Sequence, residues 1–171
     1  MHHCDPYTSM QIRKATVSDA QAVFNLRSIS IRNLCKGFYP DDLLMQWTEG
    51  THPSAGFTEF VSQVVYVVET NGTIVACGAI DKPTSQIDTV FVDPQYKNNG
   101  IGRKVMQFLE EIAMEHRVKS PLRLEATLNA APFYRKLGFN GEALSQYHSP
   151  RGFTLDCIKM EKALSGHVNN G

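Results

Sequence analysis

The chain has 171 residues and 42% of them are hydrophobic, which suits a single domain with one sizeable core. Its 17 basic residues are balanced by 17 acidic ones, so the composition argues against nucleic acid or an anionic membrane as a partner. The N-terminus lacks the apolar core of a signal peptide and no apolar run reaches the length of a membrane span, so we expect a cytoplasmic protein.

The length, and the absence of repeats, low-complexity tracts and long linkers, predict one domain over residues 1–171, in which 1–9 and 165–171 are flexible ends. Apolar runs predict strands, in chain order, at 10–15, 64–69, 73–80, 87–92, 142–147 and 153–160. Helical spacing and capping residues predict helices at 18–34, 41–47 and 54–62. The pair Asn71-Gly72 predicts a tight turn between the second and third strands. Two further segments each predict a strand followed by a helix.

The first of these segments, residues 90–114, joins an apolar strand to an amphipathic helix through a polar turn. Gly100 and Gly102 allow backbone conformations closed to other residues, so the amides of residues 98–103 can converge on one point. The same amides open a helix, where free N–H groups and the positive end of the dipole favour an anion. Three cations surround the turn: Lys97, Arg103 and Lys104. We expect glycine at both positions because a side chain would fill space needed by a pyrophosphate or force a disfavoured backbone.

Three phosphate-binding patterns compete for this segment, besides a plain turn that contains glycine. A dinucleotide-binding fingerprint would need a third small residue where Val105 stands and an acidic residue about 20 positions further on. A Walker A loop would need Gly-Lys-Ser or Gly-Lys-Thr, which the segment lacks. The third pattern, Arg/Gln-x-x-Gly-x-Gly/Ala, is the coenzyme A loop of the GCN5-related N-acetyltransferases (GNAT family). It resembles the run KNNGIG at residues 97–102, with Lys in place of the usual Arg or Gln.

The second segment, residues 122–139, resembles another signature of the same family. There a strand precedes a short helix with the pattern A-x-x-F-Y-x-K-x-G-F, which runs here from Ala130 to Phe139. Gly138 is well placed to end this helix, and Phe139 is expected to begin the next strand. Two signatures in this order are far more specific than either alone. The chain therefore resembles the GNAT family over nearly its whole length, and in particular its small bacterial members without an assigned acceptor.

The resemblance implies an α/β fold of the α+β type, with a mixed, mostly antiparallel sheet of about seven strands, helices on both faces and splayed central strands. The co-substrate would be acetyl-CoA, with its pantetheine arm along one splayed strand and its pyrophosphate on the loop. The contact residues implied are Val90, Phe91, Val92, Asn98, Asn99, Gly100, Ile101, Gly102 and Arg103. A backbone N–H at Phe91 or Val92 is expected to bind the developing oxyanion. Thr127 stands where the family often has a cofactor-binding Asn, and Asn129 is expected to replace it in part.

The resemblance also implies direct acyl transfer to an amine, which needs a base and an acid. Tyr134 matches the family position of the acid that protonates the leaving thiolate; the alternative is an aromatic residue that only packs in the core. Asp88, on the strand before the loop, is the first candidate for the base, and Glu125 on the neighbouring strand is the second. Gln86 stands where some members carry the acid and cannot act as a base.

Acceptor choice in this family comes from the first helices. Tyr39, Leu43 and Trp47 fall on one helical face and either pack the helix onto the sheet or form an apolar wall over the acceptor. The wall would favour a small amine with a hydrophobic part over a strongly cationic one. We expect a small-molecule amine; a protein or peptide amine, and a non-catalytic module that binds or senses coenzyme A, are the alternatives. The sequence leaves a monomer and a homodimer both open.

The four cysteines predict neither a metal site nor a disulfide framework, because they form no C-x-x-C pair and no histidine stands at ligand spacing. They are Cys4, Cys35, Cys77 and Cys157. Cys77 lies within the apolar run 74–80, so we expect a buried, inert thiol there and not a nucleophile.

Overall fold

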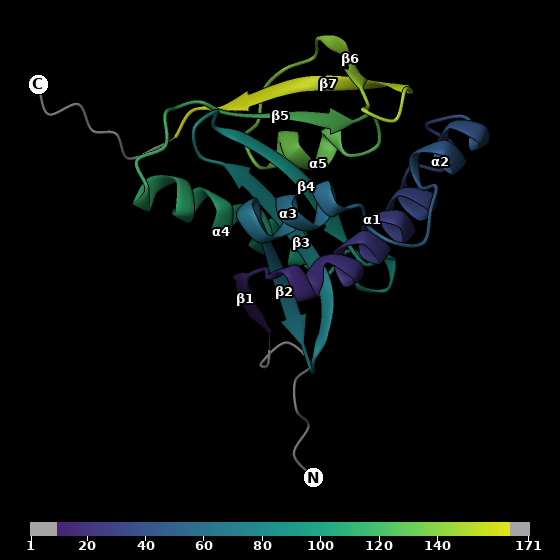
Figure 1. The fold of residues 1–171 in the computed structure, drawn as a ribbon. Coiled ribbons are helices and arrows are strands. Elements are labelled where there is room, and N and C mark those ends of the chain that lie inside the picture. Colours follow the sequence, from purple (N-terminus) through teal and green to yellow (C-terminus); the bar gives the residue numbers. More distant parts are fainter. Residues whose placement is uncertain (1–9, 165–171) are drawn as a thin grey trace, which may run out of the picture.

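The structure, a computed structural model, describes residues 10–164 and contains one seven-stranded sheet with helices packed on it (Figure 1). The strands are β1 (Gln11–Lys14), β2 (Val65–Thr70), β3 (Thr73–Asp81), β4 (Gln86–Val92), β5 (Leu122–Thr127), β6 (Leu144–His148) and β7 (Thr154–Lys162). The α-helices are α1 (Ala20–Leu34), α2 (Asp41–Trp47), α3 (Ala55–Val64), α4 (Ile101–Glu115) and α5 (Ala131–Lys136). Two 3-10 helices, η1 (Val17–Asp19) and η2 (Pro94–Tyr96), precede α1 and follow β4. The predicted flexible ends, 1–9 and 165–171, lie outside the described residues.

The helices and strands predicted from periodicity are present, with ends displaced by at most two residues. The prediction that Phe139 begins a strand is wrong. Its N–H donates to the carbonyl of Tyr134 at 3.1 Å and closes the end of α5, while its ring is buried in the core. Only the next residue pairs with the sheet, as an isolated bridge between Asn140 and Glu161. Within residues 10–164, no helix has the length and apolar character needed to cross a membrane.

The sheet is mixed and open in its centre, as the resemblance implied. Its strand order is β1-β2-β3-β4-β5-β7-β6, and every neighbouring pair is antiparallel except β4 and β5. These two run parallel and are paired only at Gln86 and Arg123, next to a hydrogen bond from the Arg123 N–H to the Ser85 carbonyl. In Figure 1, β5, β7 and β6 cross the top while β1 to β4 run below, so the two halves diverge after that contact. The backbone of β4 beyond it borders a gap.

A β-bulge bends β4 beside this gap. Ala79 of β3 faces Asp88, and Cys77 faces Phe91, so β4 has one extra residue between the two pairs. Thr89 lies in the bulge with φ of +54°, an unusual conformation for a β-branched residue. Two contacts hold it: its N–H donates to Asp88 Oδ1 at 2.7 Å, and its carbonyl accepts from the Cys77 thiol at 3.2 Å. The bulge therefore fixes where the last residues of β4 point.

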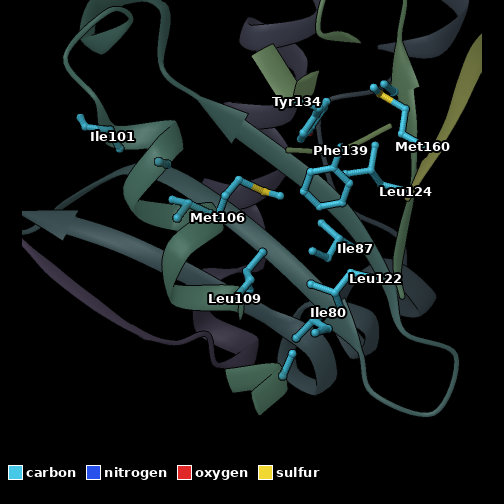
Figure 2. Close-up of a cluster of buried hydrophobic side chains, with 14 of the residues drawn as sticks. Ile80, Ile87, Ile101, Met106, Leu109, Leu122, Leu124, Tyr134, Phe139 and Met160 are labelled. Carbon is cyan, nitrogen blue, oxygen red and sulfur yellow. The ribbon is translucent and has the colours of Figure 1, made fainter. Parts of the chain in front are cut away.

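Helices cover both faces of the sheet. One core cluster joins α1 and α3 to β2 and β3, while the largest cluster joins α4 and α5 to β3, β4 and β5 on the other face. Figure 2 shows Met106 and Leu109 of α4 turned toward Ile87 and Phe139. The amphipathic stripe of α4 explains this packing, since its apolar residues recur at helical spacing and are almost fully buried.

Helix α4 packs very closely on β3, and Gly78 is what allows it. A methyl group placed on Gly78 would lie 2.6 Å from Cγ1 of Val105 and 3.0 Å from Cδ1 of Leu109. Real Cβ atoms essentially never approach another atom to 2.6 Å, so a glycine lets the helix axis approach the strand. The beginning of α4, which carries the predicted phosphate loop, is thereby held against the C-terminal end of β4.

Candidate active site

The two signature segments meet at the gap between β4 and β5. The loop after β4 leads into α4, and α5 follows β5, so both helices pack in the same core cluster beside the gap. Gly102 of the predicted coenzyme A loop lies against Phe133, the neighbour of the acid candidate Tyr134, and the base candidate Asp88 lies close enough to Tyr134 to raise its pKa.

The loop has the backbone that an anion site requires. Asn98 and Gly100 have φ of +66° and +76°, and Gly100 is the N-cap of α4, so the chain turns sharply before the helix begins. The first helical bond runs from the Lys104 N–H to the Gly100 carbonyl. The N–H groups of residues 98–103 donate no hydrogen bond to any residue between 10 and 164. They remain free for a ligand with several acceptor oxygens.

The two loop glycines serve different purposes. A methyl group on Gly100 would meet no atom within 4 Å, so its positive φ, and not lack of space, is what favours glycine there. A methyl group on Gly102 would lie 3.1 Å from Cζ of Phe133, on α5. Close packing between α4 and α5 therefore favours glycine at Gly102, independently of any space that a pyrophosphate would need.

Three cations lie around the loop as the sequence predicted: Lys97, Arg103 and Lys104. All three are exposed, and none forms a salt bridge with a residue that the structure describes. Their charge is therefore available to a ligand at the loop.

Backbone direction at the end of β4 follows from its register with β3. The Asp93 N–H donates to the Val75 carbonyl at 2.8 Å, and alternate residues of a strand point the same way, so Phe91 also directs its N–H and C=O toward β3. Val90 and Val92 direct theirs toward the gap. The Val92 carbonyl accepts from Ser30 Oγ at 2.9 Å, and its N–H points into the gap. The side chains of Val90 and Val92 pack toward α4, and Phe91 packs on the opposite face.

Tyr134 is buried, with 8% of its surface exposed, and its ring packs edge-on against Phe133 and Phe139 at centroid distances of 5.1 and 5.9 Å. Its hydroxyl forms no hydrogen bond within the described part of the chain. Burial raises the Tyr134 pKa, and the nearby Asp88 and Cys77 raise it further, so the phenol keeps its proton at neutral pH. A buried tyrosine usually pairs its hydroxyl, and Tyr134 departs from this rule. Its ring packs in the core, while its hydroxyl is an unpaired proton donor.

Asp88 projects from the bulge of β4 at the same gap. Its surface is open to solvent, but the protein atoms crowded around the carboxylate reduce its hydration and raise the Asp88 pKa. The N–H and hydroxyl of Thr89 oppose this shift, and the charge of Arg27 opposes it less strongly. A raised pKa makes a carboxylate a stronger base, which is the property expected of the base candidate.

The other candidates lie at the margins of the gap. Gln86 stands at the one point where β4 and β5 pair. Glu125 is exposed on β5, opposite Lys159 of β7. Asn129 has a buried Oδ1 without a hydrogen-bond partner among the described residues, and it lies beside the thiol of Cys35. The Asn129 carbonyl oxygen is thus an unused acceptor close to the start of α5.

Arg27 and Tyr147 also lie near Asp88, and sequence reasoning did not identify them. Arg27 of α1 donates from Nη2 to the Trp47 carbonyl at 3.1 Å. Burial, and after it the charge of Arg151, lower the Arg27 pKa to about 10, while Tyr147 and Asp88 oppose the shift. Burial raises the Tyr147 pKa, and Asp88 adds to the rise. The signal that could have identified Arg27 is its place on the apolar side of α1, between buried positions.

Tyr39 precedes α2 (Asp41–Trp47), so the prediction that it shares one helical face with Leu43 and Trp47 is wrong, and both aromatic residues are buried. Tyr39 donates to the Asp156 carbonyl at 2.6 Å and accepts from the Leu128 N–H at 3.1 Å, and burial raises its pKa to about 12. Its ring packs edge-on against Trp47 at 5.9 Å, and Leu43 joins the same core cluster. Packing of α2 onto the sheet therefore accounts for Tyr39 and Trp47.

Cys77 is fully buried, as the sequence predicted, and burial raises its pKa to about 12. Cys35 and Cys157 are also buried and free. Within residues 10–164, no group of three or more His, Cys, Asp or Glu side chains could hold a metal ion.

A separate hollow of about 480 Å³ lies between α1 and the β2–β3 hairpin. Three of the charged side chains that line it pair with one another: Arg13 contacts Asp19 and Glu69, each at 2.8 Å. These contacts raise the Arg13 pKa and lower the Asp19 pKa to about 2. The fourth, Asp93, accepts from the Gln95 N–H at 2.9 Å. Because neither the predicted coenzyme A loop nor the second signature segment lines this hollow, the β4–β5 gap is the candidate active site.

The fold and this site define the class of N-acetyltransferase domains with a splayed sheet, and comparison with known proteins agrees. The sequence model of the Acetyltransferase (GNAT) family matches residues 30–139. The chain belongs to this family. No curated protein sequence matches it.

Solved structures share the fold at low sequence identity. A GCN5-related N-acetyltransferase from Rhodopseudomonas palustris is 24% identical, with a TM-score of 0.83 over 91% of this chain and 96% of that one. The PaiA N-acetyltransferase of Thermoplasma acidophilum, solved in complex with coenzyme A, is 17% identical, with a TM-score of 0.73 over 91% and 99%. The ribosomal-protein-S18-alanine N-acetyltransferase of Escherichia coli is 20% identical, with a TM-score of 0.63 over 95% and 98%.

Proposed function

We propose that the protein transfers an acetyl group from acetyl-CoA to the primary amine of a small molecule. The observation that carries this proposal is the juxtaposition of an unpaired, protonated Tyr134 hydroxyl and the Asp88 carboxylate at one gap in the sheet. The free amides of residues 98–103 support it, because they suit the pyrophosphate of a coenzyme A molecule. The similar PaiA N-acetyltransferase was solved with coenzyme A, which is consistent with this assignment. We further propose a cytoplasmic enzyme, since acetyl-CoA is available there.

Binding of the co-substrate is assigned to three groups of atoms. The amides of Asn98, Asn99, Gly100, Ile101, Gly102 and Arg103 would hold the pyrophosphate, with the nearby cations adding charge. The backbone of Val90 and Val92, which faces the gap, would pair with the pantetheine arm. The unpaired Oδ1 of Asn129 would accept a hydrogen bond from the same ligand. Phe91 would contribute through its ring, since its backbone is directed toward β3.

The chemistry then needs a proton acceptor, an oxyanion donor and a proton donor. The bound acetyl-CoA supplies a thioester carbon open to attack. Asp88 accepts a proton from the amine as the amine nitrogen bonds to that carbon. The raised pKa of Asp88 suits this task. The Val92 N–H stabilises the negative charge on the acyl oxygen. Tyr134 donates its proton to the sulfur as the C–S bond breaks, so that an amide and a free thiol are the products.

The proposal is tested with acetyl-CoA and a panel of amines. Calorimetry should show binding of acetyl-CoA at micromolar level or better, and at 100 times the Kd the ligand should add about 2.7 kcal/mol to the free energy of unfolding. Release of free thiol should depend on the amine. Binding without thiol release for any small or peptide amine would favour the alternative, a module that senses coenzyme A. Turnover of peptide amines alone would make the protein a peptide N-acetyltransferase.

A further inference from the structure

Two arginines lie near one another beside the candidate site, and neither has a carboxylate partner among the described residues. Arg27 of α1 donates from Nη2 to the Trp47 carbonyl at 3.1 Å, and Arg151 of the β6–β7 loop donates from Nη1 to the Glu49 carbonyl at 2.9 Å. Both side chains therefore reach the C-terminal end of α2, Arg27 from a helix that precedes α2 in the chain and Arg151 from a loop that follows it. Neither forms a salt bridge with any residue in the described range 10–164.

The second amino group of Arg27 is the unusual feature. Its Nη1 atom is buried and has no hydrogen-bond partner among the described residues. A buried donor on a cation is costly to leave unpaired, more so than a neutral one. The guanidinium nevertheless keeps its charge at neutral pH, because its pKa is lowered only to about 10.

Capping of α2 does not explain this arrangement. Cations near a helix C-terminus commonly bind its last carbonyl groups, and Arg32 does so from the same helix α1. Arg32 donates from Nε to Thr48 Oγ1 at 2.9 Å and from Nη2 to the Thr48 carbonyl at 3.1 Å. Arg32 is exposed, so water reaches its remaining donors, whereas Arg27 keeps a donor buried and unused. Capping accounts for one half of the Arg27 guanidinium only.

The unused half belongs to a guanidinium that lies near the base candidate of the proposed reaction. Asp88, Tyr147 and Arg151 all lie close enough to Arg27 to affect its charge. Asp88 is not within salt-bridge distance of the guanidinium. The site thus has an anion, Asp88, where an amine would be deprotonated, and beside it a cationic pair without a counter-ion.

Resting on the proposed function, we propose that Arg27, with Arg151 beside it, binds a carboxylate of the acceptor, so that the acceptor is an amino acid or another amine carrying a carboxylate. The planar guanidinium fork matches a carboxylate and binds it more strongly than a neutral acceptor. The same two cations disfavour polyamines. This assignment gives a substrate-binding role to Arg27, which lies outside both signature segments.

The test compares amines in matched pairs that differ only in the carboxylate. L-Leucine is paired with 3-methylbutylamine and L-phenylalanine with 2-phenylethylamine, and kcat/KM is measured from thiol release at saturating acetyl-CoA. The carboxylate member of at least one pair should be preferred by about 10-fold or more, the range of a charge-assisted hydrogen bond. In Arg27→Gln the preference should fall close to one, and in Arg27→Lys it should be intermediate, because the charge remains and the fork is lost.

Arg32→Gln is the matched control, since it removes a cation and a contact with the end of α2 but lies outside the site. It should keep the wild-type preference. The wild-type comparison needs no variant to fold, and melting temperature and acetyl-CoA affinity are measured for each variant. Equal or better use of the plain amines would overturn the inference and leave the proposed function intact. Thiol release with neither member of any pair, in a protein that binds acetyl-CoA, would refute the inference together with its catalytic basis.

Discussion

Replacing Tyr134 with Phe should separate catalysis from stability. The substitution keeps the ring, which packs against Phe133 and Phe139, and removes only a hydroxyl that forms no hydrogen bond with the described residues. Loss of an existing hydrogen bond would cost about 1 kcal/mol, and here there is none to lose. The free energy of unfolding of Tyr134→Phe should therefore stay within about 1 kcal/mol of wild type, or rise slightly.

Catalysis should respond very differently. If Tyr134 protonates the leaving thiolate, removing its proton donor should lower kcat by about 10²- to 10⁴-fold, the usual contribution of a general acid. Acetyl-CoA affinity should change little, because the hydroxyl is not among the atoms assigned to binding. The assay combines thiol release at saturating acetyl-CoA with urea unfolding and calorimetry on the same preparation.

Two outcomes would refute this reasoning in different ways. A Phe variant with near wild-type kcat on its best amine would remove Tyr134 from the mechanism and leave protonation to water. A loss of stability well above 1 kcal/mol would mean that the hydroxyl has a structural partner. Tyr39→Phe is the comparison, since the Tyr39 hydroxyl bonds to the Asp156 carbonyl and the Leu128 N–H and its loss should destabilise the fold.

Three further predictions concern the base and two glycines. The kcat should fall as pH drops through the raised pKa of Asp88, and Asp88→Asn should lose both turnover and this dependence on pH. A carboxylate whose pKa is raised by folding makes the folded protein less stable as pH rises through its unfolded-state pKa, so Asp88→Asn should also melt at a higher temperature than wild type at pH 7. An unchanged pH profile in Asp88→Asn would assign the base elsewhere. Gly100→Ala forces an L-residue to φ of +76°, a strain of about 1–2 kcal/mol, and should weaken acetyl-CoA binding about tenfold by calorimetry. Wild-type affinity would show that this turn does not matter for binding. Gly78→Ala should destabilise the fold by about 1–3 kcal/mol in urea because of Val105, while Gly56→Ala, in open space on α3, should not; equal effects would contradict the close packing of α4.

The sequence by itself determined the order of the elements and the class of the fold. Strands and helices follow from local periodicity, so their bounds were predictable within two residues. The positive φ of Gly100 follows from the turn that the loop pattern requires. The splay of β4 from β5 was implied by the family resemblance and not by any local pattern. These features depend on residues close together in the chain, or on a signature that such residues carry.

Tertiary structure alone decided the details that give the site its chemistry. The bulge at Thr89 depends on how β4 pairs with β3, and the contact of Gly102 with Phe133 depends on how two helices pack. Phe139 left its predicted strand because its N–H closes α5 and its ring fills the core. Arg27 lies near Asp88 only because α1 packs on the face of the sheet that is opposite to α4 and α5. Burial, unpaired donors and shifted pKa values depend on contacts between segments that are far apart in the sequence. Periodicity and spacing describe only neighbouring residues and do not predict such contacts.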